Sequence, residues 1–359
     1  MTSVYVTSIQ TFSGKTAVCL GVSRQMQADG FKVGYVKPLG TQPRTRSVAG
    51  YCDKDALFAK QVLGLAEPLD VLAPVCLMPE LVQEQLMGAS TDLTTVVVEA
   101  YNKVRQNKDV VVVEGGASLR EGYAVGLATP KAARMLGAPV LAVVKFDGDV
   151  QVIDDALSAQ AQLGDQLIGV VINSVPADNL QFAREVVRPA LERRRIGVFG
   201  ILPEESRLLA TSIGEIADAA DAQFLCHADK RDVLVEKLAV GAMGVEEARA
   251  RFSKIPNKAI ITGGDRGDMI GMALDTSVKL IILTGNLMPN PDVLHRAVEM
   301  GVPVVLVPYD TLQTVERIER FFGKGRLAHR EKLALFKALL AEHFDYKRLY
   351  ERIGLEAGK

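Results

Sequence analysis

The sequence lacks several features that would point to particular classes of protein. It contains no tryptophan, and its four cysteines, Cys19, Cys52, Cys76 and Cys226, are scattered without the short spacings of metal ligands. A zinc site or a disulfide framework is therefore not indicated. The 42 basic and 43 acidic residues leave a net charge of −1. This balance excludes the basic footprint expected of a protein that binds nucleic acid or an anionic membrane.

Long hydrophobic segments are also missing. No apolar run approaches the roughly 20 residues that span a bilayer. The N-terminal residues enter a strand-like run without the basic region and apolar core of a signal peptide. Together with the scattered cysteines, these absences predict a cytoplasmic protein with neither membrane nor nucleic-acid partners. A length of 359 residues, 48% of them hydrophobic and 24% charged, is ordinary for a soluble chain of two or three domains.

A candidate phosphate-binding loop lies near the N-terminus. The β-branched run Val4 to Thr7 predicts a buried strand, a polar loop follows at 8–13, and Gly14-Lys15-Thr16 then opens a helix. Backbone N–H groups and the positive end of a helix dipole at such a junction face an anion. Lys15 can reach β- and γ-phosphates, and the Thr16 hydroxyl can hold Mg²⁺. The alternative is a surface turn that closes an ordinary βα unit.

Strand-like and helical segments alternate through residues 1–225. The strand candidates are rich in Val, Ile and Leu without two-residue alternation, as in strands buried on both faces of a parallel sheet. They span residues 4–7, 32–37, 110–113, 140–145, 167–172 and 196–201. Helices are expected between them at 16–29, 53–63, 90–107, 129–136, 150–163 and 182–194. The pattern predicts an α/β fold with a doubly wound parallel sheet.

Polar side chains follow the carboxyl ends of these strands, where open parallel sheets bind ligands. Lys37 follows the second strand and Glu114 the third, and the fifth runs into Asn173. Glu114 can hold Mg²⁺ or simply cap a helix, and Lys37 can neutralise phosphate or be a surface lysine. Asp53 and Asp55 open a helix, where carboxylates also act as caps.

These motifs resemble the dethiobiotin synthetase branch of P-loop proteins, whose loop reads Gly-Thr-Asp-Thr-x-x-Gly-Lys-Thr. Here Ser8 replaces the first glycine of that loop. The family's Tyr-Lys-Pro resembles Tyr35-Val36-Lys37-Pro38, and its Ser-Asp-Ala-Leu resembles Lys54-Asp55-Ala56-Leu57. Its Val-Glu-Gly-Ala-Gly-Gly resembles the sequence at 113–118. The segment after Pro38 differs from the family pattern, which leaves the biotin-pathway substrate open.

The resemblance implies particular roles for the residues of the site. Mg²⁺ would lie among Thr16, Asp55 and Glu114, and Lys15 and Lys37 would contact phosphates as the catalytic cations. The adenine would lie near Asn173. The remaining nucleotide contacts would come from the loop, namely Thr11, Ser13 and Gly14, together with Lys15 and Thr16. The implied cofactors are ATP and Mg²⁺.

A second, smaller α/β domain is expected at 257–325, after a helical connector at 226–256 and before a helical tail at 326–359. Strands at 259–262, 279–283 and 303–307 alternate with helices at 269–274 and 292–300. The segment 264–268 resembles the motif of the DRTGG domain. For Asp265 and Arg266 we weigh a ligand-sensing or subunit-contact loop against an internal salt bridge. The amphipathic tail is expected to pack on a neighbouring domain or partner chain.

The order of domains resembles the N-terminal region of long bacterial phosphate acetyltransferases. In that family the acetyl transfer belongs to a further C-terminal domain, so acetyltransferase activity is not expected from this chain. The first hypothesis is a Mg·ATP-binding regulator that senses nucleotide and a metabolite. The second is an ATP-dependent carboxylate-activating synthase, with an acceptor carboxylate, of the dethiobiotin synthetase or cobyrinic acid a,c-diamide synthase type. The third is a scaffold with a vestigial loop. Dethiobiotin synthetases pair as dimers, and this resemblance implies that the chain forms a homo-oligomer.

Overall fold

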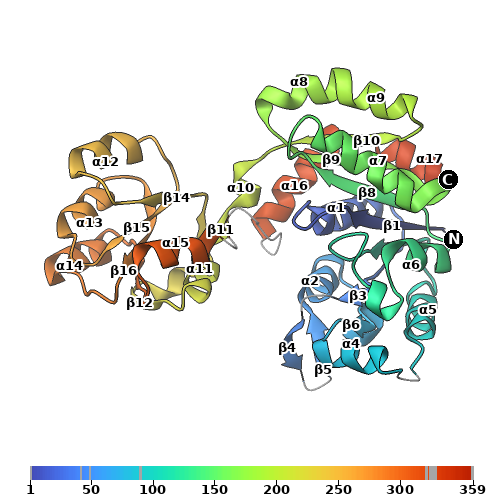
Figure 1. Ribbon diagram of the computed structural model, residues 1–359, viewed down its shortest axis with the longest axis horizontal. Coiled ribbons are helices and arrows are strands. Elements are labelled where there is room, and N and C mark those ends of the chain that lie inside the picture. Colours follow the sequence, from blue (N-terminus) through green and yellow to red (C-terminus); the bar gives the residue numbers. More distant parts are fainter. Residues whose placement is uncertain are drawn as a thin grey trace. The chain divides into compact units, whose positions relative to one another are not determined.

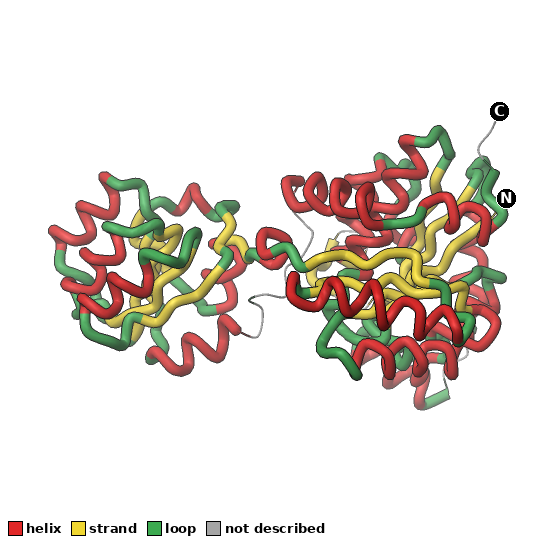
Figure 2. Tube along the Cα trace, turned by 90° about the horizontal axis from the view of Figure 1, so that it is seen from above, coloured by secondary structure: helices red, strands yellow, loops and turns green. Residues whose placement is uncertain are grey.

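The computed structural model describes residues 2–40, 43–47, 50–88, 91–319, 322 and 330–356, with the side chains of 43–52, 330 and 331 left undescribed. The chain forms two compact units, each with its own sheet between helices (Figures 1 and 2). Unit 1 comprises residues 1–204 and 327–359, and unit 2 comprises residues 205–326. Unit 2 is therefore inserted into the sequence of unit 1.

Unit 1 is built on a six-stranded sheet with the order β10-β9-β8-β1-β7-β2, in which every paired strand is parallel. Its strands are β1 (Thr2–Ser8), β2 (Val33–Val36), β7 (Val110–Glu114), β8 (Val140–Lys145), β9 (Leu167–Val175) and β10 (Val198–Pro203). These match the six predicted strands. The predicted α/β fold with a parallel sheet is confirmed.

The valine-rich strands are buried on both faces because helices cover both sides of the sheet. Val110–Val113 and Val140–Val144 are fully buried, which explains why their sequences show no alternation. The helices that pack around the sheet are α1 (Lys15–Ala28), α2 (Lys54–Leu63), α5 (Leu93–Val104), α6 (Thr129–Met135), α7 (Gln151–Leu163) and α9 (Arg188–Arg193). Between β2 and α5 lie β3 (Leu39–Gly40), β4 (Pro43–Ser47), β5 (Gly50–Asp53), α3 (Leu69–Leu72), β6 (Val75–Cys76) and α4 (Pro79–Leu86).

The predicted helix at 182–194 is interrupted by a wider turn. It begins as α8 (Leu180–Phe182), continues as the π-helical turn η4 (Ala183–Val187) and ends as α9. Pro189 accounts for the change, since proline lacks an N–H group and its ring clashes with the carbonyl four residues earlier in an α-helix. Widening the turn relieves that clash.

The C-terminal helices complete unit 1, and the predicted tail packs on the P-loop domain of its own chain. In α16 (Arg330–His343), Phe336 and Leu340 are buried against Gly21 of α1. The chain then meets the edge strand β10, where Gly200 and Phe344 form an antiparallel bridge. Helix α17 (Tyr346–Ile353) follows, and the Ile353 carbonyl accepts a hydrogen bond from the Thr2 hydroxyl. The two ends of the chain therefore lie side by side (Figure 1).

Unit 2 contains a five-stranded sheet with the order β12-β17-β16-β15-β14, in which only β12 is antiparallel to its neighbour. The strands are β12 (Gln223–Cys226), β14 (Lys237–Val240), β15 (Lys258–Gly263), β16 (Val278–Thr284) and β17 (Val304–Leu306). Its helices include α11 (Ile213–Ala219), α12 (Val245–Phe252), α13 (Gly267–Leu274), α14 (Pro291–Glu299) and α15 (Thr311–Glu319). Unit 2 also contains the short elements α10 (Ser206–Leu209), β11 (Thr211–Ser212) and β13 (Leu234–Val235).

The structure corrects the expected helical connector at 226–256. That segment contributes β13, β14 and one helix, α12, to unit 2, and β14 pairs in parallel with β15. The four residues of β14, Lys-Leu-Ala-Val, form a short edge strand between charged segments, and those segments made the sequence look helical. The boundary also moves: unit 2 begins at Glu205, so residues 205–225, expected in the first domain, belong to it.

Candidate functional site

The loop between β1 and α1 presents the start of a helix without a side-chain cap. Gly14 occupies the N-cap position with φ of 88°, a left-handed conformation that glycine adopts without strain. No side chain that the structure describes caps this end of α1, and its first turn has no acidic residue. The N-terminal amides and helix dipole thus keep their positive potential, as anion sites at helix N-termini require.

Glu114 lies at the end of β7, directly beside this loop, because β7 pairs with β1 in the sheet. Its Oε1 atom accepts hydrogen bonds from Lys15 Nζ at 2.6 Å and from Thr16 Oγ1 at 2.7 Å. Its Oε2 atom accepts a third from the Tyr35 hydroxyl at 2.8 Å. Glu114 is fully buried and Lys15 is only 8% exposed. The structure therefore joins the loop lysine, the loop threonine and the strand-end carboxylate in one cluster.

The charges around Glu114 keep it ionised. Burial alone would raise the pKa of this carboxyl, but the cations of Lys15 and Lys37 and the hydrogen bonds from Lys15 and Thr16 outweigh burial and lower the pKa to about 2. Burial in turn raises the pKa of Tyr35, so the tyrosine stays a hydrogen-bond donor. The cluster is thus a buried carboxylate with a full set of donors.

Lys37 belongs to a second cluster beside the first. Its Nζ lies 2.9 Å from Asp53 Oδ1 and 2.6 Å from Asp55 Oδ2. Lys37 and Asp53 are 1% and 0% exposed. Burial would lower the pKa of Lys37, but Glu114, Asp55 and Asp53 together raise it. Asp53 also accepts hydrogen bonds from the backbone N–H groups of Asp55 and Ala56, so one carboxylate both caps α2 and pairs with Lys37.

Asn173, at the end of β9, holds the loop in place. Its Nδ2 donates to the Ser13 carbonyl at 2.8 Å, and both residues are buried. A Cβ atom at Gly14 would lie 2.2 Å from the same Nδ2, so this packing leaves room only for glycine. A further contact runs from Gln10 Nε2 to Asp147 Oδ2 at 3.0 Å, just past β8. Together with Glu114 of β7, these contacts tie the loop to the ends of three strands, β7, β8 and β9.

The structure brings some predicted site residues together and separates others. Thr16 and Glu114 are adjacent, whereas Asp55 is turned to Lys37. Within the described part of the chain, no group of three or more His, Cys, Asp or Glu side chains is placed to hold a metal ion. Thr11 is exposed on the loop and Ser13 is buried behind it. Asp55 as a magnesium ligand and Asn173 as an adenine contact stay predictions.

Sequence reasoning missed two members of the site. Tyr35 stands in the strand-two motif, two residues before Lys37, but only the fold shows that its hydroxyl reaches Glu114. The sequence indicates a helix cap at Asp53, and its pairing with Lys37 follows from the close approach of the end of β2 and the start of α2. The sequence feature that could have identified both is their position, two residues before the predicted site residues Lys37 and Asp55.

In unit 2, the contacts of Arg266 agree with the interpretation that this residue forms an internal salt bridge. Its Nε lies 3.2 Å from Asp268 Oδ1, and its NH2 donates to the Met243 carbonyl at 3.3 Å. Asp265 is exposed. A Cβ atom at Gly264 would lie 1.6 Å from the Leu287 carbonyl oxygen, so glycine is required where these two loops meet.

We expect the unfolding free energy to depend on pH through Glu114. Its pKa falls from the ordinary 4.5 to about 2 on folding, so its stabilisation is complete above pH 4.5 and is lost as pH drops toward 2. The difference corresponds to about 3 kcal/mol. Urea unfolding of Glu114→Gln between pH 5 and 2 should show a slope smaller by about one proton than wild type. Glu99→Gln, an exposed control, should keep the wild-type slope; equal slopes for Glu114→Gln and wild type would contradict the assignment.

The sheet order, the loop and the Lys15–Thr16–Glu114 cluster define unit 1 as a P-loop domain. The family described as "AAA domain" matches residues 2–212, and the chain belongs to that family. The DRTGG domain matches residues 215–321. The predicted combination of a P-loop domain with a DRTGG domain is confirmed.

Phosphate acetyltransferases are among the curated relatives. That of Nitrosomonas europaea is 24% identical over 371 residues, which cover 99% of this chain and 52% of the relative. That of Synechocystis is 26% identical and covers 97% of this chain and 51% of the relative. The chain thus spans about half the length of the curated relatives that it matches. Among solved structures, the MinC:MinD cell division protein complex of Aquifex aeolicus has a TM-score of 0.36 at 18% identity, covering 58% of this chain and 84% of the other.

No helix in the described residues is both long and apolar enough to cross a membrane.

Proposed function

We propose that this protein binds Mg·ATP at the loop of unit 1 and acts as a nucleotide-responsive regulator. One observation carries the proposal: Lys15 and Thr16 stand at an uncapped helix N-terminus and are held there by the buried Glu114. In this arrangement Glu114 occupies the donors that a triphosphate would use. With nucleotide bound, Lys15 would contact the phosphates, and the Glu114 carboxylate would be free to hold the metal.

The residues present fit a magnesium ion bound together with the nucleotide. Thr16 supplies a hydroxyl oxygen and Glu114 a carboxylate within 2.7 Å of it, and oxygen ligands of this kind suit Mg²⁺. Asp55, 27% exposed in its side chain, is the proposed third group, directly or through water. Bound Mg²⁺ would neutralise charge on the phosphates. Thr11, Ser13 and Gly14 would complete the cradle with backbone N–H groups.

The regulatory assignment is favoured over the synthase by the surroundings of Lys37. A lysine that stabilises a transferred phosphoryl group must reach substrate. Lys37 is 1% exposed and paired with two carboxylates, which suits a residue that positions Asp53 and Asp55. We propose in addition that the protein is a cytoplasmic homo-oligomer and that unit 2 binds a metabolite.

Turnover measurements separate the regulator from the synthase. Wild-type protein would be incubated with Mg²⁺ and ATP, with ammonia and bicarbonate present, against a panel of mono- and dicarboxylic acids. We expect equilibrium dialysis to show ATP binding, and ADP release to stay at the same low level whichever acid is added. ADP release that rises with one particular acid, and is lost in Lys15→Met, would contradict the regulatory assignment and establish the synthase.

A further inference from the structure

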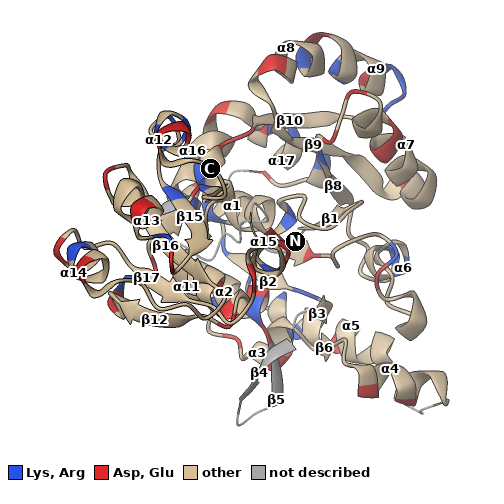
Figure 3. Cartoon of the chain, turned by 60° about the vertical axis from the view of Figure 1, so that its left-hand side comes forward, with Lys and Arg blue, Asp and Glu red and all other residues tan. Residues whose placement is uncertain are grey.

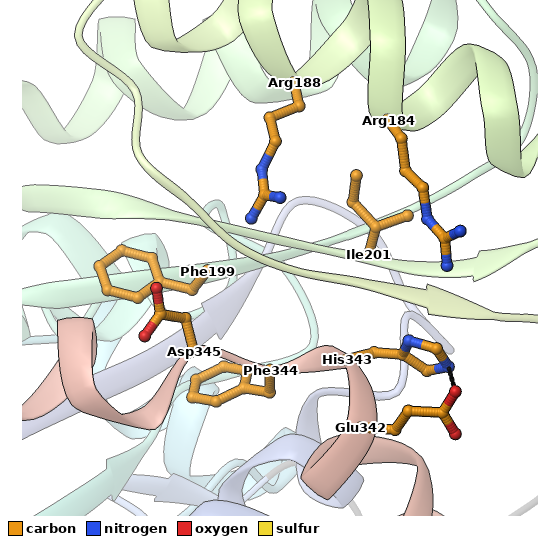
Figure 4. Close-up of a pocket in the computed structure, with 8 residues that line it drawn as sticks. All are labelled: Arg184, Arg188, Phe199, Ile201, Glu342, His343, Phe344 and Asp345. Carbon is orange, nitrogen blue, oxygen red and sulfur yellow. Dashed lines mark ion pairs between the residues drawn. The ribbon is translucent and has the colours of Figure 1, made fainter.

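A cavity of about 430 Å³ lies in unit 1 beside the edge strand β10 and shares no residue with the phosphate loop. We propose that it binds a small organic oxyanion, a phosphate or carboxylate carried on an apolar ring or chain. The cavity lies between the π-helical segment and the turn that joins α16 to α17 (Figure 4). Its lining residues are Arg184, Arg188, Phe199, Ile201, Glu342, His343, Phe344 and Asp345.

Two arginines supply the charge on one wall. Arg184 lies in η4 and Arg188 opens α9, and both side chains descend toward the cavity in Figure 4. Arg184 is exposed and makes no hydrogen bond or ion pair with any residue that the structure describes. Arg188 NH2 donates to the Val198 carbonyl at 3.1 Å, and its Nε lies 4.0 Å from Glu192 Oε1 in an ion pair but has no hydrogen-bond partner in the described structure. Guanidinium groups with unused donors are suited to bind planar or tetrahedral oxyanions in pairs of hydrogen bonds.

Aromatic side chains supply the apolar floor. Phe199 of β10 and Phe344 of the C-terminal segment stack with ring centroids 6.4 Å apart and an interplanar angle of 28°. The bridge between Gly200 and Phe344, and a 2.7 Å hydrogen bond from the Asp345 amide to the Phe199 carbonyl, hold the two segments together. Ligand in the cavity would therefore contact both β10 and the chain that returns from unit 2.

Two carboxylates also belong to the lining. Asp345 caps α17 by accepting a 2.9 Å hydrogen bond from the Arg348 amide. Glu342 lies 3.6 Å from His343, and its side chain is 77% exposed. The helical segment from α8 to α9 carries residues of both signs (Figure 3). Arg184 is thus a cation of the lining that no carboxylate in the described structure pairs with, and the cavity volume suits a small molecule.

Isothermal titration calorimetry with two probes tests this site. Phenyl phosphate and phenylacetate present the two forms of oxyanion on the same ring, and benzyl alcohol presents the ring without the charge. We expect at least one of the two anions to bind with one molecule per chain, and benzyl alcohol to bind at least about ten times more weakly. The anion that binds more tightly identifies the class of ligand for this cavity as a phosphate or a carboxylate.

Two matched variants locate the binding. Arg184→Gln removes an exposed guanidinium that has no ion-pair partner among the described residues. It should weaken the affinity for the anion by about tenfold and leave the melting temperature unchanged. Arg193→Gln, an exposed arginine of α9 outside the cavity, should bind as wild type does. The proposal is overturned if neither anion binds at about 10 mM, or if Arg184→Gln binds within twofold of wild type. Binding that Lys15→Met abolishes and Arg184→Gln leaves intact would place the anion at the phosphate loop instead.

Discussion

Replacing Lys15 by methionine is expected to weaken Mg·ATP binding at least about 100-fold. Lys15 opens α1, and in our proposal its Nζ leaves Glu114 for phosphate oxygens; charge-assisted hydrogen bonds to phosphate are among the strongest in proteins. A loss of this size corresponds to about 2.7 kcal/mol. Methionine keeps most of the apolar stem, so the buried packing around it is retained. Equilibrium dialysis with labelled ATP gives the two affinities.

Loss of folding would imitate this result, because Lys15→Met leaves the buried Glu114 without its nearest cation. The double variant Lys15→Met with Glu114→Gln removes both charges and should recover much of the thermal stability while still failing to bind ATP. Lys103→Met, an exposed lysine of α5, is the matched control and should bind normally. An affinity of Lys15→Met within about threefold of wild type would remove Lys15 from the phosphate site.

Lys37→Met is expected to cause a large loss of stability, about 3–5 kcal/mol, because it removes the buried cation that lies 2.9 Å from the buried Asp53 carboxylate. Asp53 also caps α2, so the whole start of that helix depends on the pair. Urea unfolding followed by circular dichroism measures the change. The exposed Lys32→Met should stay within about 0.5 kcal/mol of wild type.

A second variant distinguishes charge from packing in this result. Lys37→Met combined with Asp53→Asn removes the uncompensated charge and keeps a hydrogen-bond acceptor for the amides of Asp55 and Ala56. It should regain part of the lost free energy. If Lys37→Met costs less than about 1 kcal/mol, the buried pair is not the structural element that we describe.

Local patterns in the sequence sufficed for the strands and the loop, because the physics that fixes them is local. Buried parallel strands are recognised by their runs of valine, and Gly14-Lys15-Thr16 indicates the start of α1. The partners inside the site were harder to predict. Lys37 pairs with Asp53 although the two residues are 16 positions apart in the sequence. Nothing in the residues near Tyr35 indicates that its hydroxyl reaches Glu114.

The arrangement of domains was the least predictable feature, because it depends on contacts between distant segments. β14 is an edge strand of only four residues, and the charged residues around it predict a helical connector instead. The amphipathic pattern of α16 shows that one face is covered, but the covering surface is α1, more than 300 residues earlier in the chain. Insertion of unit 2 into unit 1 follows from that contact and from no local signal.

A crystal structure of the wild-type protein grown with Mg²⁺ and a non-hydrolysable ATP analogue tests the central claim most directly. We predict the triphosphate at the start of α1, with Lys15 Nζ moved from Glu114 to a phosphate oxygen and with Thr16 and Glu114 facing the metal, directly or through water. Nucleotide bound elsewhere, or Lys15 still paired with Glu114 at 2.6 Å in crystals that contain the analogue, would contradict it.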